Sequence, residues 1–165
     1  MPDASARSSR VLFVCLGNIC RSPAAEGVMR HTVAARDVTD RIDIDSAGTA
    51  GYHEGAAADA RMRRAARARG YDLTSRARAV RDDDFTRFDL IVAMDRSNQR
   101  DLRARADRLG VDAAHVVLLS SFLDADAPVD CPDPYYGGAE GFETVLDLVE
   151  RGCPAIVDQL LAADA

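Results

Sequence analysis

Short apolar runs alternate with longer, mostly amphipathic segments along this chain. The runs are rich in Val, Ile, Leu and Phe, and they predict buried strands over residues 10–14, 42–46, 88–94 and 115–119. The longer segments are rich in Ala, Leu and Arg, and they predict helices over residues 22–35, 56–69, 97–109, 142–151 and 155–162. Ser22-Pro23 is a helix start and Gly70 a helix stop, while Pro154 separates the last two predicted helices.

This alternation predicts βαβ units and hence an α/β fold. We expect a single domain over residues 10–165, with a four-stranded parallel sheet and helices on both faces, preceded by a flexible tail over residues 1–9. Ligands of such folds bind where the strands end, near the point at which the strand order reverses. The loops after the first and the fourth strand are therefore the candidate sites.

Composition narrows the class of protein. The 165 residues carry 21 basic and 27 acidic side chains, a net charge of −6, which argues against nucleic acid as a partner. No segment approaches the roughly 18 apolar residues that cross a bilayer, and the polar opening of the chain lacks the apolar centre of a secretory signal. Four cysteines are too sparse for a disulfide scaffold. We expect a cytoplasmic monomer without a membrane partner.

The loop after the first strand carries the strongest chemical signal. It reads CLGNICRS and spans residues 15–22. Gly17 and Asn18 tolerate positive φ, so that successive backbone N–H groups can turn inward and bind an anion. The start of the following helix and the forked guanidinium of Arg21 favour phosphate at the same place. These positive groups also favour the thiolate form of Cys15, which would be a nucleophile aimed at phosphorus and a target for oxidation.

Two plainer interpretations compete with this one. Cys15 could be an inert buried residue at the end of a strand, as free cysteines often are. It could also belong to a zinc site, but no second pair of Cys or His residues lies at ligand spacing, so we expect no metal. The run Asp82-Asp83-Asp84 lacks the glycine and distal glutamate of a calcium loop and is better explained as a helix start or a loop.

Longer motifs go beyond the loop. They are VLFVCLGNICRSPAAE over residues 11–26, DSAGT over 45–49, AMDRSN over 93–98 and DPYY over 133–136. In this content and order the chain resembles the low-molecular-weight protein-tyrosine phosphatases. The resemblance covers nearly the whole chain after residue 9. It implies hydrolysis of protein phosphotyrosine and small aryl phosphates through a cysteinyl-phosphate intermediate, with no cofactor.

The resemblance also implies a role for each matching residue. Cys15 is the nucleophile, Arg21 the phosphate clamp, and Asp133 the general acid and then the general base. The phosphate or another oxyanion is bound by Leu16, Gly17, Asn18, Ile19, Cys20, Arg21 and Ser22. Ser22 also supports the Cys15 thiolate, Ser46 holds Asn18, and Asp95 either supports the loop or caps the next helix. Tyr52, Tyr135 and Tyr136 form the substrate pocket, with His53 at its rim. Independently of the resemblance, Cys20 lies five residues after Cys15 in a loop that curls round one phosphate, so we expect the two sulfurs to form a reversible disulfide on oxidation.

One position departs from the family pattern. Many relatives carry a His near the phosphate loop where this chain has Ser75. We therefore expect the hydrogen bonds around Asn18 to be built differently here.

Other functions share this fold. Arsenate reductases that resemble the family need a further Cys pair, but no Cys lies between Cys20 and Cys131. Protein-arginine phosphatases usually carry Thr where this chain has Ile19, and their acid loop is shorter with a single aromatic residue. A non-catalytic phosphate-binding module would lack the nucleophile or the acid, and this chain has both.

Overall fold

The structure is a computed structural model, and it describes residues 8–163. Most of the predicted N-terminal tail, residues 1–7, lies outside the described residues. The first strand, β1 (Ser9–Cys15), starts one residue earlier than predicted and places Ser9 in the sheet, so the expectation that the tail reaches residue 9 is wrong. Ser9 is buried, and its hydroxyl donates to the carbonyl of Leu160. This contact anchors the start of β1 to the C-terminal helix.

The sheet has four parallel strands, as predicted. Their order is β2-β1-β3-β4, with β2 (Ile42–Gly48), β3 (Leu90–Ala93) and β4 (Val116–Leu118). The chain moves from β1 to β2 on one side and then returns to place β3 on the other side of β1. The carboxyl end of β1 is thus the point where the strand order reverses, and the CLGNICRS loop begins there.

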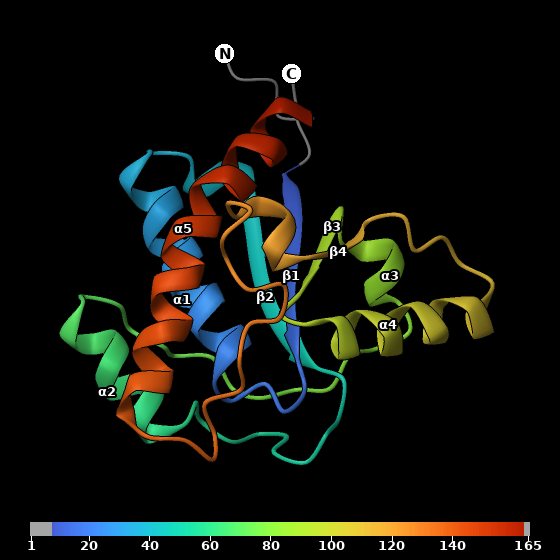
Figure 1. Cartoon of the computed structure of the whole chain (residues 1–165). Helices are drawn as coiled ribbons and strands as arrows, with labels where there is room; N and C mark the ends of the chain where they lie inside the picture. The colour runs from blue at the N-terminus through green and yellow to red at the C-terminus, as the bar shows by residue number, and fades with distance from the viewer. Residues whose placement is uncertain (1–7, 164–165) are drawn as a thin grey trace.

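Helices cover both faces of this sheet (Figure 1). On one face lie α1 (Arg21–Ala35) and α5 (Ala139–Ala163), which pack against each other, with α2 (Ala60–Ala68) beside α5. On the other face lie α4 (Arg96–Leu109) and the short α3 (Asp84–Arg87). Alternate side chains of β1 enter the two cores, so that Phe13 belongs to the first and Leu12 to the second.

The predicted break between the last two helices is wrong. One helix, α5, continues through Pro154. Proline removes one backbone hydrogen bond from a helix, but buried residues lie on both sides of this one, including Val149, Cys153 and Val157. The apolar stripe along α5 therefore outweighs the local preference of proline. Gly152 helps the helix to pack closely, since a Cβ there would lie 2.9 Å from Leu119 Cδ1.

Other differences from the predicted bounds are smaller. Helix α2 begins at residue 60 instead of 56, because Asp59 caps it by accepting hydrogen bonds from the N–H groups of Arg61 and Met62. The last two predicted strands, 88–94 and 115–119, are longer than the observed β3 and β4. A 3-10 turn, Leu119–Phe122, directly follows β4. Another, Thr39–Arg41, precedes β2. Asp84, the last residue of the acidic run over residues 82–84, begins a helix, α3.

Candidate active site

The loop between β1 and α1 turns on a strained residue. Asn18 has a φ of 57°, in the left-handed region that few residues other than glycine adopt. Its backbone N–H points back at Cys15 and donates to the sulfur at 3.3 Å. Neighbouring Gly48 lets the loop lie tightly on β2, because a Cβ at this position would come within 2.6 Å of the Leu16 carbonyl oxygen. The residue that makes the turn is thus also the one that directs an N–H group at the thiol.

Hydrogen bonds from the side chain of Asn18 hold this conformation. Its amide nitrogen donates to the hydroxyls of Ser22 at 2.8 Å and Ser46 at 3.0 Å. Its amide oxygen accepts from the backbone N–H of Arg78 at 3.0 Å. Ser46 in turn donates to Glu26 on α1 at 2.6 Å. Ser75 makes none of these contacts, so Asn18 is held without a histidine at position 75.

Arg78 is itself fixed by two carboxylates. Its guanidinium forms a bidentate pair with Asp84, which is fully buried, and a further ion pair with Asp45. Burial alone would lower the pKa of Arg78, but the hydrogen bond with Asp84 and the charge of Asp45 outweigh burial and raise it. The N–H group that holds Asn18 therefore belongs to a residue tied to both β2 and α3. Sequence reasoning missed Arg78 and Glu26, although Glu26 lies inside the first motif.

Cys15 ends β1 at the bottom of the loop. Its sulfur lies 3.0 Å from the Ser22 hydroxyl, which sits in the first turn of α1. Both residues are buried. The Ser22 hydroxyl, the Asn18 N–H and the positive end of α1 are thus all directed at this sulfur.

Arg21 is buried beside this thiol, and its guanidinium has three partners on two segments, the start of α4 and the stretch after β4. Its Nη1 atom lies 2.6 Å from Asp95 Oδ2 and donates to the Cys131 carbonyl at 3.0 Å. Its Nη2 atom lies 3.6 Å from Asp133 Oδ2. Burial acts to lower the pKa of Arg21. The charge of Cys15 and the hydrogen bond with Asp95 outweigh burial, so that the pKa is raised. The guanidinium is therefore a permanent cation in a fixed orientation.

Asp95 has both of the roles that sequence reasoning left open. One carboxylate oxygen pairs with Arg21, while the other accepts from the backbone N–H of Asn98 and caps α4. The capped helix fixes the position of Asp95, and Asp95 in turn fixes the guanidinium of Arg21.

Asp133 lies in the segment that follows β4, opposite the thiol. We call residues 132–138 the acid loop. The Asp133 side chain is 44% exposed, and its Oδ1 atom accepts from the backbone N–H of Tyr135 at 3.1 Å. The other oxygen is the one nearest Arg21. A carboxyl group so placed can exchange a proton with solvent and reach a leaving group above the thiol.

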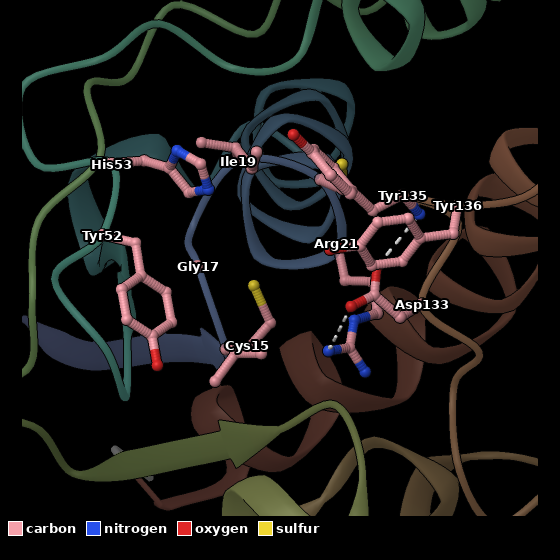
Figure 2. Close-up of a pocket in the computed structure, with 11 residues that line it drawn as sticks. Cys15, Gly17, Ile19, Arg21, Tyr52, His53, Asp133, Tyr135 and Tyr136 are labelled. Carbon is pink, nitrogen blue, oxygen red and sulfur yellow. Dashed lines mark hydrogen bonds and ion pairs between the residues drawn. The ribbon is translucent and has the colours of Figure 1, made fainter.

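These residues surround a cleft of about 310 Å³ (Figure 2). Tyr52 and His53 stand on one side of the Cys15 sulfur, with Asp133 and the two tyrosines of the acid loop across from them. The walls and floor combine ten predicted site residues, Cys15, Leu16, Gly17, Ile19, Cys20, Arg21, Tyr52, Asp133, Tyr135 and Tyr136, with His53 at the rim. Asn18, Ser22, Ser46 and Asp95 lie outside this lining and make the supporting contacts described above.

The tyrosines of the cleft are open to solvent, although they are aromatic. Tyr52 is 77% exposed and Tyr136 94%. The Tyr135 ring stacks edge-on against Tyr136 at 4.9 Å between centroids and lies 6.3 Å from the His53 ring. A flat aromatic ligand entering the cleft would cover ring surface that water now contacts.

The other cysteines differ from Cys15 in their surroundings. Burial first, and then the charge of Asp59, raise the pKa of Cys20 to about 12. Burial likewise raises the pKa of Cys131 to about 12, although Arg21 acts against this shift. Burial also raises the pKa of Cys153. All three are neutral thiols at physiological pH.

Residues 8–163 contain neither a cluster of metal ligands nor a membrane-spanning helix. Within that range no group of three or more Cys, His, Asp or Glu residues is placed to hold a metal ion. None of the described helices combines the length and the apolar composition that a membrane span requires.

Known proteins are similar to this chain in both sequence and fold. A family model described as low molecular weight phosphotyrosine protein phosphatase matches residues 10–164. A low molecular weight protein-tyrosine-phosphatase of Streptomyces coelicolor is 48% identical over 150 residues, which cover 90% of this chain and 91% of the relative.

Solved structures agree with this match. The protein tyrosine phosphatase of Entamoeba histolytica, solved with Hepes in the active site, superposes with a TM-score of 0.88 at 40% identity over 96% of this chain and 100% of that one. A drosophila arginine phosphatase superposes with a TM-score of 0.85 at 32% identity over 90% of this chain and 96% of that one. The motifs, the sheet order and these matches agree, and the chain belongs to the low-molecular-weight phosphotyrosine protein phosphatase family.

Proposed function

We propose that this enzyme hydrolyses protein phosphotyrosine and small aryl phosphates through a cysteinyl-phosphate intermediate. The observation that carries the proposal is the placement of Cys15, Arg21 and Asp133 around one cleft with tyrosines at its mouth. The chemistry needs no metal, because the loop N–H groups and Arg21 supply the positive charge that a phosphoryl group requires.

In the first step the Cys15 thiolate attacks phosphorus and forms an S–P bond. The bond between phosphorus and the phenolic oxygen breaks, and Asp133 transfers its proton to that oxygen so that the tyrosine leaves as a neutral phenol. Arg21 holds two of the phosphoryl oxygens, while the loop N–H groups face the charge that develops on them.

In the second step the same carboxyl group works in reverse. Asp133, now a carboxylate, accepts a proton from water as the water oxygen attacks phosphorus. The S–P bond breaks, the thiolate is regenerated, and inorganic phosphate leaves with Asp133 protonated again. Because Ser22 contacts the sulfur at 3.0 Å, it supports the thiolate as leaving group in this step.

Substrate choice follows from the walls of the cleft. Leu16, Ile19 and the tyrosines present apolar and aromatic surface between the rim and the thiol. A phenyl ring spans that distance, whereas phosphoserine would have to draw polar backbone into the cleft, which is unfavourable. The guanidinium of phosphoarginine would meet the apolar Ile19 with its N–H groups unpaired.

A second candidate, protein-arginine phosphatase activity, is favoured by the likeness to the drosophila arginine phosphatase. Ile19 and the paired tyrosines of the acid loop argue against it for this chain. The arsenate reductase candidate stays weak, because the sequence contains no Cys between Cys20 and Cys131. A purely phosphate-binding role would not require an acid beside the guanidinium, yet Asp133 is there.

The nucleophile can be tested directly. Cys15→Ser should abolish turnover of an aryl phosphate, because a serine hydroxyl is barely ionised at neutral pH. Vanadate should still bind, measured by calorimetry, because Arg21 and the loop N–H groups remain. Cys153→Ala, which alters a thiol on α5 away from the cleft, serves as the control. More than a trace of turnover by Cys15→Ser would rule out the mechanism.

The role of the acid predicts a dependence on the leaving group. Asp133→Ala should lower kcat/KM by roughly 10²–10⁴-fold for aryl phosphates with poor leaving groups. The loss should shrink for phenols acidic enough to leave without a proton. A loss of the same size across the whole series would instead indicate that Asp133 has a structural role.

Specificity can be measured with matched peptides in buffer containing EDTA. The wild-type enzyme should hydrolyse phosphotyrosine fastest, phosphoarginine more slowly and phosphoserine slowest. Ile19→Thr should narrow the gap between the first two, because its hydroxyl can accept from a guanidinium. Faster hydrolysis of phosphoarginine by the wild type would leave fold and mechanism intact but overturn the substrate assignment.

We also propose that the enzyme is cytoplasmic and that reversible oxidation controls its activity. A reducing compartment protects a reactive thiol from oxidation, whereas peroxide would oxidise Cys15 to a sulfenic acid. The Cys20 thiol can then condense with it, releasing water and forming a disulfide that a thiol reductant reverses.

Peptide mapping after mild peroxide treatment should find the Cys15–Cys20 disulfide. Recovery of Cys15 only as sulfinic acid, with Cys20 free, would contradict this.

A further inference from the structure

A chain of contacts joins the phosphate loop to the acid loop without passing through Cys15 or Arg21. It begins at Ile19, whose carbonyl oxygen accepts from the backbone N–H of Asp59 at 2.8 Å. Asp59 is the capping residue of α2, so the first turn of that helix is fastened to the loop that would hold the phosphate.

The next link is the ion pair between Asp59 and Arg61. The Nη2 atom of Arg61 lies 2.9 Å from Asp59 Oδ2, and its Nε atom lies 3.2 Å from Oδ1. The hydrogen bond from Arg61 is the main reason why the pKa of Asp59 is lowered, and burial opposes it only in part. The two side chains are charged at neutral pH and held in a fork geometry that lysine cannot reproduce.

Arg61 then reaches the acid loop. The same Nη2 atom donates to the Tyr135 carbonyl at 3.1 Å. The guanidinium carbon lies 5.5 Å from the centroid of the Tyr135 ring and 4.9 Å from that of Phe142 on α5, within the range of cation–π contacts. One guanidinium thus holds both the backbone and the ring of Tyr135.

The last link is Tyr135 to Asp133. The Tyr135 N–H donates to Asp133 Oδ1 at 3.1 Å and leaves Oδ2 as the oxygen nearest Arg21 (Figure 2). Pro134 is buried, but Tyr135 to Gly138 are all exposed, so the contacts of Arg61 with Tyr135 add to the packing of Pro134 in holding this part of the acid loop. Arg61 itself does not line the active-site cleft.

From this chain of contacts we propose that Arg61 is a positioning residue for proton transfer, acting through Tyr135 on Asp133. The inference rests on the proposed role of Asp133 as general acid. Because misplacing a reacting group by about 1 Å can cost up to about 100-fold in rate, a tether that fixes Tyr135 relative to the phosphate loop also fixes the proton donor relative to phosphorus. Its effect should appear only where the leaving group needs a proton.

The test compares Arg61→Ala and Arg61→Lys with Arg64→Ala. Arg64 has the same charge, lies one turn further along α2 and is exposed, so its replacement controls for loss of a cation near the cleft. The readout is kcat/KM for a series of aryl phosphates plotted against the pKa of the leaving phenol, with vanadate affinity and melting temperature measured alongside.

For Arg61→Ala we expect a steeper dependence on the leaving group. The loss should reach about tenfold for the poorest leaving groups and stay within about twofold for the best, with vanadate affinity unchanged. Arg61→Lys should behave like Arg61→Ala, because an ammonium cannot bridge Asp59 and Tyr135 while stacking on two rings. Arg64→Ala should follow the wild type. A uniform loss across the series, or full activity of Arg61→Lys, would overturn the proposal.

A double variant separates this proposal from the one it rests on. In an Asp133→Ala background, Arg61→Ala should cause no further change in kcat/KM, because the group that it positions is gone. Additive losses would show that Arg61 acts by another route and would overturn the inference. If Asp133→Ala alone leaves the leaving-group dependence unchanged, then the acid assignment has failed, and the Arg61 proposal fails with it.

Discussion

The catalytic edge of this protein depends on Asn18 staying in the left-handed region of backbone conformation. That conformation is strained for a residue with a side chain, and the hydrogen bonds of its own amide group hold it there. If Asn18 relaxed, its N–H would no longer face the Cys15 sulfur, and the loop would lose the inward-pointing donors that bind an anion. The buried Arg78–Asp84 pair and the close approach allowed by Gly48 support the same conformation from β2 and α3.

Helix starts gather around this loop. Helix α1 begins in it, α2 is capped by Asp59 against the Ile19 carbonyl, and α4 is capped by the carboxylate that pairs with Arg21. The acid loop leads directly into α5. The positive ends of α1, α2 and α4 therefore lie close to the loop. The net charge of −6 is therefore a poor guide to the potential at the cleft.

Much of this arrangement could be predicted from the chain alone, because its determinants are local. Apolar runs and Ser-Pro or Gly signals located the strands and most helices, and the short spacing within residues 15–22 brought the loop residues together. The break at Pro154 was predicted wrongly, because the local preference of proline was given more weight than the helical spacing of apolar residues, which continues through it from Val149 to Val157. Arg78 and Arg61 were missed for a related reason. The chain has many arginines, and only tertiary contacts distinguish the two that hold Asn18 and Tyr135.

The packing of α5 on α1 connects the two loops that form the cleft. One helix starts at the phosphate clamp and the other directly after the acid loop, and both run away from the cleft along the same face of the sheet (Figure 1). The packing of these two helices therefore helps to hold the acid loop relative to the phosphate loop. Arg36, at the end of α1, forms an ion pair with Asp158 of α5. Nearer the start of α1, the Cys153 thiol lies 3.9 Å from the Ala25 carbonyl oxygen. A shift of one helix along the other would therefore move the acid loop relative to the phosphate loop without changing any group in the cleft.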